Sequence, residues 1–282
     1  MQLKLYKTLW GFDGDHVDAV EAAVDAGFDG IEGPPPGDAG QRRRFKRALA
    51  THGLDYIAEI CTAGSYVPDR RATVAEHLAS LKQRLAWSRE LNPRFVTSLA
   101  GCDAWAEQQS IDFFGSAMAL AAAFELPISF ETHRSRSLFN PWTTRRIAMA
   151  LPAMQLTVDF SHWCVVCERL MDTELDVIET LAPQVRHIHA RVGYEQGPQV
   201  PHPAAPEYAE ALHAHQRWWT IVWQAMKKRG LDVVTMTPEF GPDGYLHHMP
   251  FSQLPVADLD DLNLWMAETE RAHFAQFLAA SC

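Results

Sequence analysis

The sequence predicts an α/β protein, a single (β/α)8 barrel in which residues 1–282 form one domain. The chain has 282 residues, a length that single barrels of this kind commonly reach. Short β-rich runs alternate with longer segments of helical periodicity from end to end, and eight such repeats close a parallel barrel. No glycine-rich phosphate-binding motif follows the first run, which disfavours a doubly wound open sheet.

The predicted strands are short runs rich in β-branched and aromatic residues. They cover residues 3–9, 29–32, 54–60, 95–98, 128–131, 156–159, 185–190 and 233–239. The segments between them repeat apolar residues at helical spacing. These predicted helices cover residues 17–26, 41–51, 73–91, 111–124, 143–151, 174–181 and 208–229, and a last helix at 256–279 closes the chain.

Composition and charge limit the classes of function. The formal net charge is −10, and a nucleic-acid partner would favour the opposite balance. No stretch approaches the roughly 20 uninterrupted apolar residues of a membrane span, and the N-terminal residues lack the pattern of a signal peptide. Five scattered cysteines, at positions 61, 102, 164, 167 and 282, predict no disulfide framework and a reducing, cytoplasmic compartment.

Polar residues share one face of each of the last four predicted strands. Because side chains alternate along a strand, Ser129 and Glu131 lie on the face opposite Ile128 and Phe130. The same alternation recurs in the next three strands. In a barrel the apolar face meets the surrounding helices, so the polar face looks inward.

Each of these strands carries an ionisable residue at its C-terminal end: Glu131, Asp159, His189 and Glu239. That end of a barrel is where active sites form. Three carboxylates converging without a counter-charge would repel one another, and a cation resolves this. A set of three oxygen ligands and one nitrogen ligand suits Mn²⁺, Mg²⁺, Co²⁺ or Zn²⁺. A single glutamate at a strand end is more often a salt-bridging residue, but four in one inward register indicate a metal site.

Two segments near the mouth of the barrel are candidates for its walls. The long irregular stretch 192–206 follows the seventh strand and is expected to form a lid or wall of the site. Trp10 is expected to line an apolar face of the pocket or to pack in the core.

Trp218 and Trp219 lie on the helix after the irregular stretch. They indicate packing against the barrel or a subunit interface, which leaves a homo-oligomer open.

Five motifs resemble the xylose isomerase-like barrel superfamily, the sugar isomerase and epimerase group that also contains inosose dehydratases and endonuclease IV. In chain order they are Gly-Phe-Asp-Gly-Ile-Glu at 27–32, Phe-Glu-Thr-His at 130–133, Val-Asp-Phe-Ser-His at 158–162, Ile-His-Ala-Arg at 188–191 and Pro-Glu-Phe at 238–240. Together they span nearly the whole chain, and their order and spacing are jointly specific.

The resemblance implies that Glu131, Asp159, His189 and Glu239 hold one divalent metal ion, with Mn²⁺ favoured. It also implies that Glu131 and Glu239 are catalytic and exchange protons with a substrate carbon from opposite faces. His162, Arg191 and His133 would contact substrate oxygens. Glu32, at the end of the second strand, would be a further substrate contact or would support a metal ligand.

The sequence departs from this pattern at two places. Many members carry an acid after the basic residue on the seventh strand, whereas Arg191 is followed by Val192 and Gly193. The third strand has no histidine at its end, and endonuclease IV needs additional histidine ligands. These departures argue against an endonuclease and leave the substrate open.

The resemblance implies an isomerase or epimerase of carbohydrate metabolism that acts on a keto sugar or related polyol through a metal-bound enediolate. The alternative in another reaction class is a lyase, either an inosose-type dehydratase or an enzyme that cleaves keto-glycosides. A third reading, a barrel that has lost its metal and serves as a binding protein, is disfavoured because the four-residue set is intact.

Overall fold

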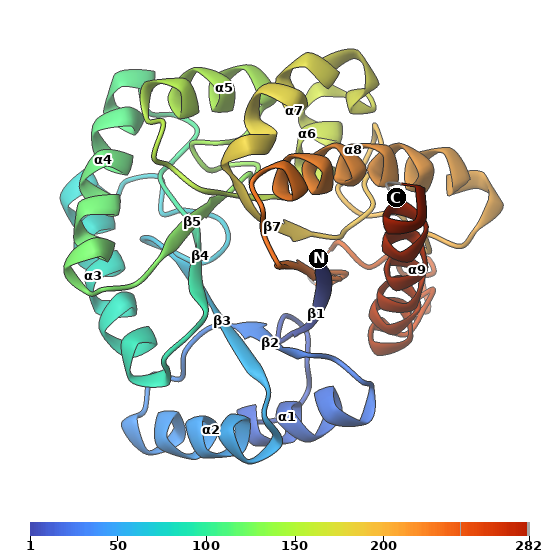
Figure 1. Cartoon of the computed structure of the whole chain (residues 1–282), viewed down its shortest axis with the longest axis horizontal. Coiled ribbons are helices and arrows are strands. Elements are labelled where there is room, and N and C mark those ends of the chain that lie inside the picture. The colour runs from blue at the N-terminus through green and yellow to red at the C-terminus, as the bar shows by residue number, and fades with distance from the viewer. Residues whose placement is uncertain (243, 281–282) are drawn as a thin grey trace.

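Eight parallel strands form a closed barrel in the computed structural model of the chain, which describes residues 1–242 and 244–280. Each strand pairs with the next, and β1 closes the ring by pairing with β8, with Gln2 opposite Val233. Figure 1 shows the strands in the centre and the helices around them. The strands are β1 Gln2–Thr8, β2 Gly30–Gly33, β3 Asp55–Cys61, β4 Phe95–Leu99, β5 Ile128–Glu131, β6 Leu156–Val158, β7 Val185–His189 and β8 Val233–Thr237.

The helices between the strands begin and end where local signals place them. Thr73 caps α3 in a capping box with Glu76, and Gly53, in the left-handed region at φ 66°, ends α2. The helices are α1 His16–Asp25, α2 Ala39–His52, α3 Val74–Leu91, α4 Glu107–Ala123, α5 Pro141–Ala150, α6 Ser161–Cys167, α7 Leu175–Leu181, α8 Ala209–Lys228 and α9 Leu259–Ala280. The short helix α6 is absent from the list expected from periodicity, since seven residues are too few to show a period.

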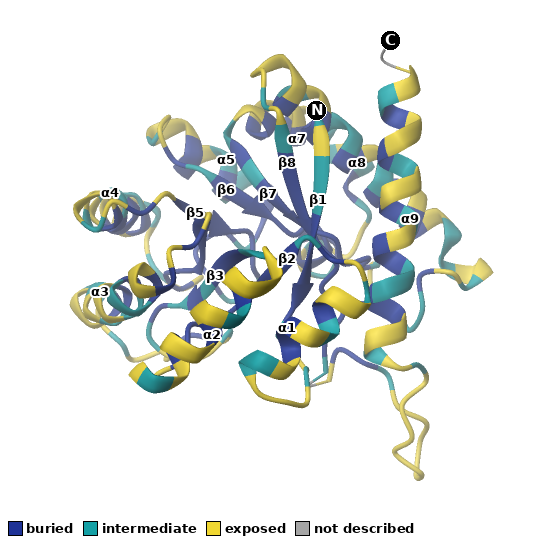
Figure 2. Cartoon of the chain, turned by 60° about the horizontal axis from the view of Figure 1, so that its bottom comes forward, coloured by how far each residue is buried: buried dark blue, intermediate teal, exposed yellow. Residues whose placement is uncertain are grey.

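The apolar core lies between the barrel and its helices. Strands are buried along most of their length, whereas the outer faces of the helices are exposed (Figure 2). Trp218 and Trp219 on α8 are fully buried in this core. They therefore pack against the barrel and are not exposed for contact with a partner subunit.

The interior of the barrel changes from apolar to polar along its axis. Tyr6, Ile57 and Phe95 form a separate buried cluster on the inward faces of β1, β3 and β4. Further along the strands, hydroxyl groups pair with one another: Thr157 Oγ1 lies 2.7 Å from Ser129 Oγ and 3.1 Å from Thr97 Oγ1. The ionisable residues follow at the strand ends, as the alternation predicts.

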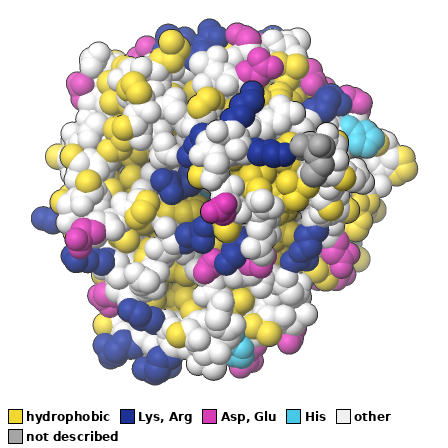
Figure 3. Space-filling view, in the orientation of Figure 1, with side chains coloured by type: hydrophobic (Ala, Val, Ile, Leu, Met, Phe, Trp, Pro, Cys, Tyr) yellow, Lys and Arg dark blue, Asp and Glu magenta, His cyan; other side chains and the backbone are white. Residues whose placement is uncertain are grey.

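The predicted fold class is confirmed, and every predicted strand is present with ends shifted by one or two residues. The four cysteines in the described part of the chain are free, and Cys282 lies outside it. Within the described residues no helix is long and apolar enough to cross a membrane. Basic and acidic side chains are interspersed over the face seen in Figure 3.

Candidate metal centre and substrate cavity

Glu131, Asp159, His189 and Glu239 converge at the C-terminal end of the barrel. Glu131 and His189 are the last residues of β5 and β7, and Asp159 and Glu239 follow β6 and β8. Each offers one ligand atom, and these four atoms all lie within 4.8 Å of one another. All four residues are buried, none more than 4% exposed. The structure therefore brings together the four residues that the strand pattern singled out.

The polar atoms of this group lack the partners that buried polar atoms normally have. Glu131 Oε2, Glu239 Oε2 and His189 Nδ1 form no hydrogen bond, although they are buried. His189 Nδ1 lies 3.1 Å from Glu239 Oε2 and 3.5 Å from Glu131 Oε1, which is close enough to share one ion. Glu131 and Glu239 thus keep unused oxygen lone pairs, Asp159 is bonded to Ser161 and Arg191, and His189 offers Nδ1 once that nitrogen is deprotonated. Three oxygen donors and one nitrogen donor of this kind fit a divalent cation of the Mn²⁺, Mg²⁺, Co²⁺ or Zn²⁺ type.

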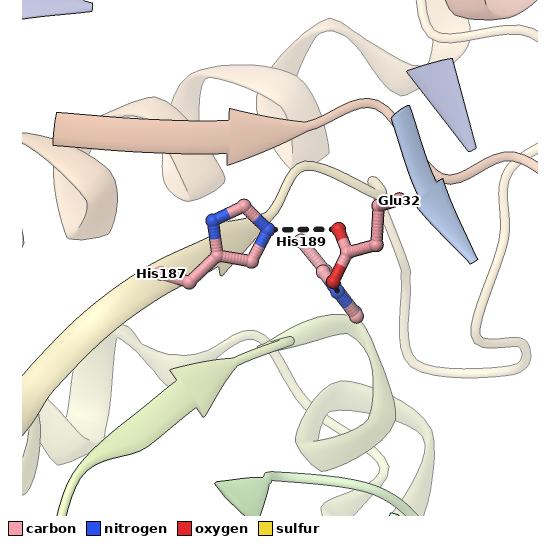
Figure 4. Close-up of side chains that lie close together, drawn as sticks. All are labelled: Glu32, His187 and His189. Atoms are coloured by element: carbon pink, nitrogen blue, oxygen red, sulfur yellow. Dashed lines mark hydrogen bonds and ion pairs between the residues drawn. The ribbon is translucent and has the colours of Figure 1, made fainter. Parts of the chain in front are cut away.

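The carboxylate of Glu32 on β2 contacts two histidines, His187 and His189 (Figure 4). Its Oε1 is 3.1 Å from His189 Nε2, and its Oε2 is 2.9 Å from His187 Nε2. Burial alone would raise the pKa of Glu32, but the two imidazoles hold it well below its usual value. The carboxylate thus accepts a hydrogen bond from Nε2–H of His189, which keeps the proton on Nε2 and leaves Nδ1 to face the other ligands.

Arg191 provides the positive charge that the carboxylates need in this structure. Its Nε donates to Asp159 Oδ2 at 3.1 Å, and its Nη2 also contacts Asp159 Oδ2 and lies 3.3 Å from Glu239 Oε2. The guanidinium lies over two rings that pack against each other, 5.2 Å from the centroid of Trp10 and 4.9 Å from that of Tyr245. Its Nη1 is buried without a partner, so one donor remains for a ligand.

The pKa shifts of these groups reflect burial and mutual attraction. Burial raises the pKa of Glu131 to about 7. Burial acts in the same direction on Glu239, but His189 and Arg191 outweigh it and lower its pKa. Burial would lower the pKa of His189, whereas the neighbouring carboxylates, first that of Glu239, raise it well above its usual value. Burial raises the pKa of Asp159 against the pull of Arg191. A divalent cation would supply positive charge in place of the proton on His189, because a ligating imidazole must be neutral.

His133 and His162 lie together beside this centre, with ring centroids 3.9 Å apart. Burial lowers the pKa of both well below the usual value, so both are neutral. His162 Nε2 accepts from Arg191 Nη2 at 2.9 Å, and Nδ1 therefore carries the proton and has no partner. With Glu131 these histidines form a second group of possible ligands, but the adjacent Arg191 cation disfavours a second metal ion there.

A cavity of about 400 Å³ opens over the centre. Of the predicted site residues, those that line it are Trp10, Glu131, His133, Arg191 and Glu239. Glu32 and His162 are not among the lining residues, and Glu32 contacts His189 instead. The lining also contains residues that the sequence analysis did not single out, among them Glu59, Tyr66 and Tyr245.

The expectation that the stretch 192–206 forms a lid or wall is wrong for this cavity. None of its residues is among the lining residues in the described part of the chain. Gly193 N donates to His215 Nε2 on α8 at 3.3 Å, and Gln199 exchanges hydrogen bonds with Gly241 at 2.9 and 3.3 Å. These contacts hold the stretch against α8 and the segment after β8.

The model of a known family matches residues 20–199, more than half of the chain; its description is "Xylose isomerase-like TIM barrel". The chain belongs to this family. A search of curated protein sequences found no match.

Solved structures share the fold at low identity. An L-ribulose 3-epimerase is 15% identical with a TM-score of 0.69, and the alignment covers 99% of this chain and 96% of that one. The probable 3-DHS dehydratase AsbF from Bacillus anthracis is 14% identical with a TM-score of 0.62, covering 96% and 99%. The IOLI protein with a bound zinc atom is 13% identical with a TM-score of 0.63, covering 99% of each chain. The same fold thus occurs in solved structures with different named activities.

Proposed function

We propose that this protein is a divalent-metal-dependent isomerase or epimerase of a keto sugar or a related polyol. The observation that carries the proposal is the convergence of Glu131, Asp159, His189 and Glu239, with buried unpaired atoms, beneath a cavity of about 400 Å³. Membership of the xylose isomerase-like family and the fold shared with an L-ribulose 3-epimerase support it. A bound cation, best Mn²⁺, would polarise a substrate carbonyl and acidify the adjacent C–H.

Glu131 and Glu239 are the proposed proton carriers. Both line the cavity, whereas Asp159 and His189 do not. Glu131 lies on β5 and Glu239 follows β8, and both carboxylates approach His189 Nδ1, at 3.5 and 3.1 Å. One carboxylate takes a proton from the carbon beside the carbonyl, and the other returns a proton from the opposite face. The net reaction moves the carbonyl to the neighbouring carbon or inverts the configuration of that carbon, and it needs no oxidant or reductant.

Other residues of the site hold the substrate. Arg191 lines the cavity, and its Nη1 is a buried donor without a partner, suited to an oxygen that carries partial negative charge. His162 does not line the cavity and positions Arg191, whose Nη2 donates to its Nε2 at 2.9 Å. His133 lines the same side of the cavity. Trp10 and Tyr245, whose rings pack edge to face at 4.8 Å, supply an apolar surface for the C–H face of a sugar.

The test is proton exchange by the Mn²⁺-loaded protein in D₂O with a panel of ketohexoses, followed by NMR. The proposal expects deuterium at the carbon beside the carbonyl, without elimination, and no exchange by Glu239→Gln. Loss of water from a ketohexose, or of the aglycone from a keto-glycoside, would instead establish the lyase alternative. A Mn²⁺-loaded protein that exchanges no proton of any ketose and eliminates nothing contradicts the proposal.

A further inference from the structure

The β3 wall of the cavity carries a carboxyl group that the proposed chemistry does not use. Ile57, Glu59 and Cys61 alternate onto the inward face of β3. Ile57 belongs to the apolar cluster deep in the barrel, and Glu59 and Cys61, further along the strand, line the cavity. Glu59 is half-buried, and it lies on the face that looks into the cavity.

Glu59 has no partner among the described residues. It forms no hydrogen bond or ion pair there, and it is absent from each group of possible metal ligands. The charged groups that act on it are mostly of its own sign: Glu239, Glu32 and Glu131, with His189 as the weaker counter-charge. An unpaired carboxyl group among other carboxylates is costly to keep at a half-buried position. A partner that arrives with the ligand would offset this cost.

Among the described lining residues, the cation contributed by the neighbouring helix α3 does not serve as that partner. Arg84 of α3 also lines the cavity, but its guanidinium lies over the ring of Trp87, 5.2 Å from the centroid. No ion pair joins Arg84 to Glu59 within the described residues. The carboxyl group of Glu59 therefore remains open to the cavity.

Topology sets where Glu59 stands relative to the metal centre. In a closed ring of eight strands, β3 lies opposite β7, the strand that ends in His189. A substrate whose carbonyl faces the four candidate ligands would extend across the cavity towards β3. A half-buried carboxyl group there can form a hydrogen bond to a hydroxyl group in either of its protonation states.

We propose that Glu59 binds a hydroxyl group of the substrate on the wall opposite the candidate metal ligands, and that it selects substrates that carry such a hydroxyl several atoms from the carbonyl. This inference rests on the proposed function, because it takes the occupant of the cavity to be a polyhydroxylated ketone. It assigns specificity to β3, whereas the sequence pattern directed attention to the stretch 192–206.

The experiment compares two ketones that differ in length. D-Fructose and D-tagatose carry distal hydroxyl groups, whereas dihydroxyacetone has a carbonyl and its adjacent hydroxyls but none beyond. Calorimetric titration of the Mn²⁺-loaded protein gives the Kd of each ketone for the unaltered protein, Glu59→Gln and Glu59→Ala. Glu21→Gln, at an exposed position on α1, is the matched control, and Mn²⁺ content and Tm are measured for every variant.

We expect Glu59→Ala to raise the Kd of the ketohexose that binds best by about 10- to 100-fold, the range of a hydrogen bond to a charged or buried polar group. Glu59→Gln, which keeps a hydrogen-bonding amide, should raise it less. The Kd of dihydroxyacetone, the Mn²⁺ content and the control should stay unchanged.

Equal losses for the long and short ketones, no loss for either, or loss of Mn²⁺ in Glu59→Gln would overturn the inference. Selective binding without turnover contradicts the proposed function and leaves the role of Glu59 standing. Turnover of a ketohexose with the same Kd in all variants overturns the role of Glu59 alone. A protein that binds none of the ketohexoses contradicts both.

Discussion

His189 Nε2 lies 3.1 Å from Glu32 Oε1, and this contact determines which nitrogen of His189 faces the metal centre. A proton on Nε2, shared with the carboxylate, leaves the lone pair on Nδ1. That atom lies 3.1 Å from Glu239 Oε2. Glu32 is itself fixed by His187, whose Nδ1 lies 2.8 Å from Thr235 Oγ1. The buried contacts from Thr235 through His187 and Glu32 therefore orient the candidate ligand His189.

We predict that Glu32→Gln weakens Mn²⁺ binding by about 10- to 100-fold, the usual effect of losing a carboxylate that orients a ligating histidine. The neutral amide cannot favour the Nε2 proton of His189 as the carboxylate does. Calorimetric titration with Mn²⁺ measures the affinity, with the exposed Glu21→Gln as control. An unchanged affinity in Glu32→Gln would mean that His189 needs no support from β2.

Arg191→Met tests whether the guanidinium neutralises the carboxylates in the absence of a divalent metal ion. Without it, Asp159 and Glu239 lose their buried counter-charge, so we predict that the Tm of the metal-free protein falls by about 5–10 °C. Because a divalent cation restores the balance, Mn²⁺ should raise the Tm of this variant more than that of the unaltered protein. Differential scanning fluorimetry measures both shifts, and equal Mn²⁺ shifts would contradict the prediction.

Gly193 marks a close approach between the stretch 192–206 and the metal centre. A Cβ atom at this position would lie 2.7 Å from Ser161 Cα, and Ser161 Oγ donates to the candidate ligand Asp159 at 2.5 Å. We predict that Gly193→Ala lowers the free energy of unfolding by about 1–3 kcal/mol through this clash and also weakens Mn²⁺ binding.

Gly115 on α4 is the matched control, because a Cβ atom there meets nothing within 4 Å. Gly115→Ala should stabilise the helix by about 0.5–1 kcal/mol. Urea denaturation compares the two variants. If both changed stability in the same direction, the steric explanation of Gly193 would be wrong.

The burial of His215 leads us to predict that the free energy of unfolding decreases as the pH falls. It is buried on α8, its Nδ1 donates to Ala211 O at 2.8 Å, and its Nε2 accepts from Gly193 N. Burial lowers its pKa to about 4. The folded protein thus keeps His215 neutral at a pH where the unfolded chain, with a pKa of about 6.5, already binds a proton. Its contribution to stability is full above about pH 6.5 and is lost as the pH falls towards 4.

From pH 7 to about pH 5, His215 alone should remove about 2 kcal/mol from the free energy of unfolding. His215→Gln has no titrating group at this position and should lose that much less over the same interval. Urea denaturation of both proteins at the two pH values measures the difference. Parallel losses would show that His215 does not set this dependence.

The inward alternation of side chains predicted both the barrel and its four candidate ligands, because a strand in a barrel has only two faces and one of them must be apolar. The search for ionisable residues at strand ends missed Glu59, which lies two residues before the end of β3. Only the cavity that it lines makes it a candidate for substrate binding. The path of the stretch 192–206 could not be predicted either. Its position after β7 says where it begins, whereas contacts remote in sequence, Gly193 to His215 and Gln199 to Gly241, decide where it goes.

The central claim is that the four strand-end residues hold one divalent cation. The most direct test is elemental analysis of the purified protein after incubation with Mn²⁺, Co²⁺ or Zn²⁺ and removal of unbound ion. The account predicts one ion per chain in the unaltered protein and a much lower content in Glu239→Gln, which keeps the fold but loses one charged ligand. A correctly folded protein that takes up none of the three ions, or a Glu239→Gln variant that binds as much as the unaltered protein, would contradict it.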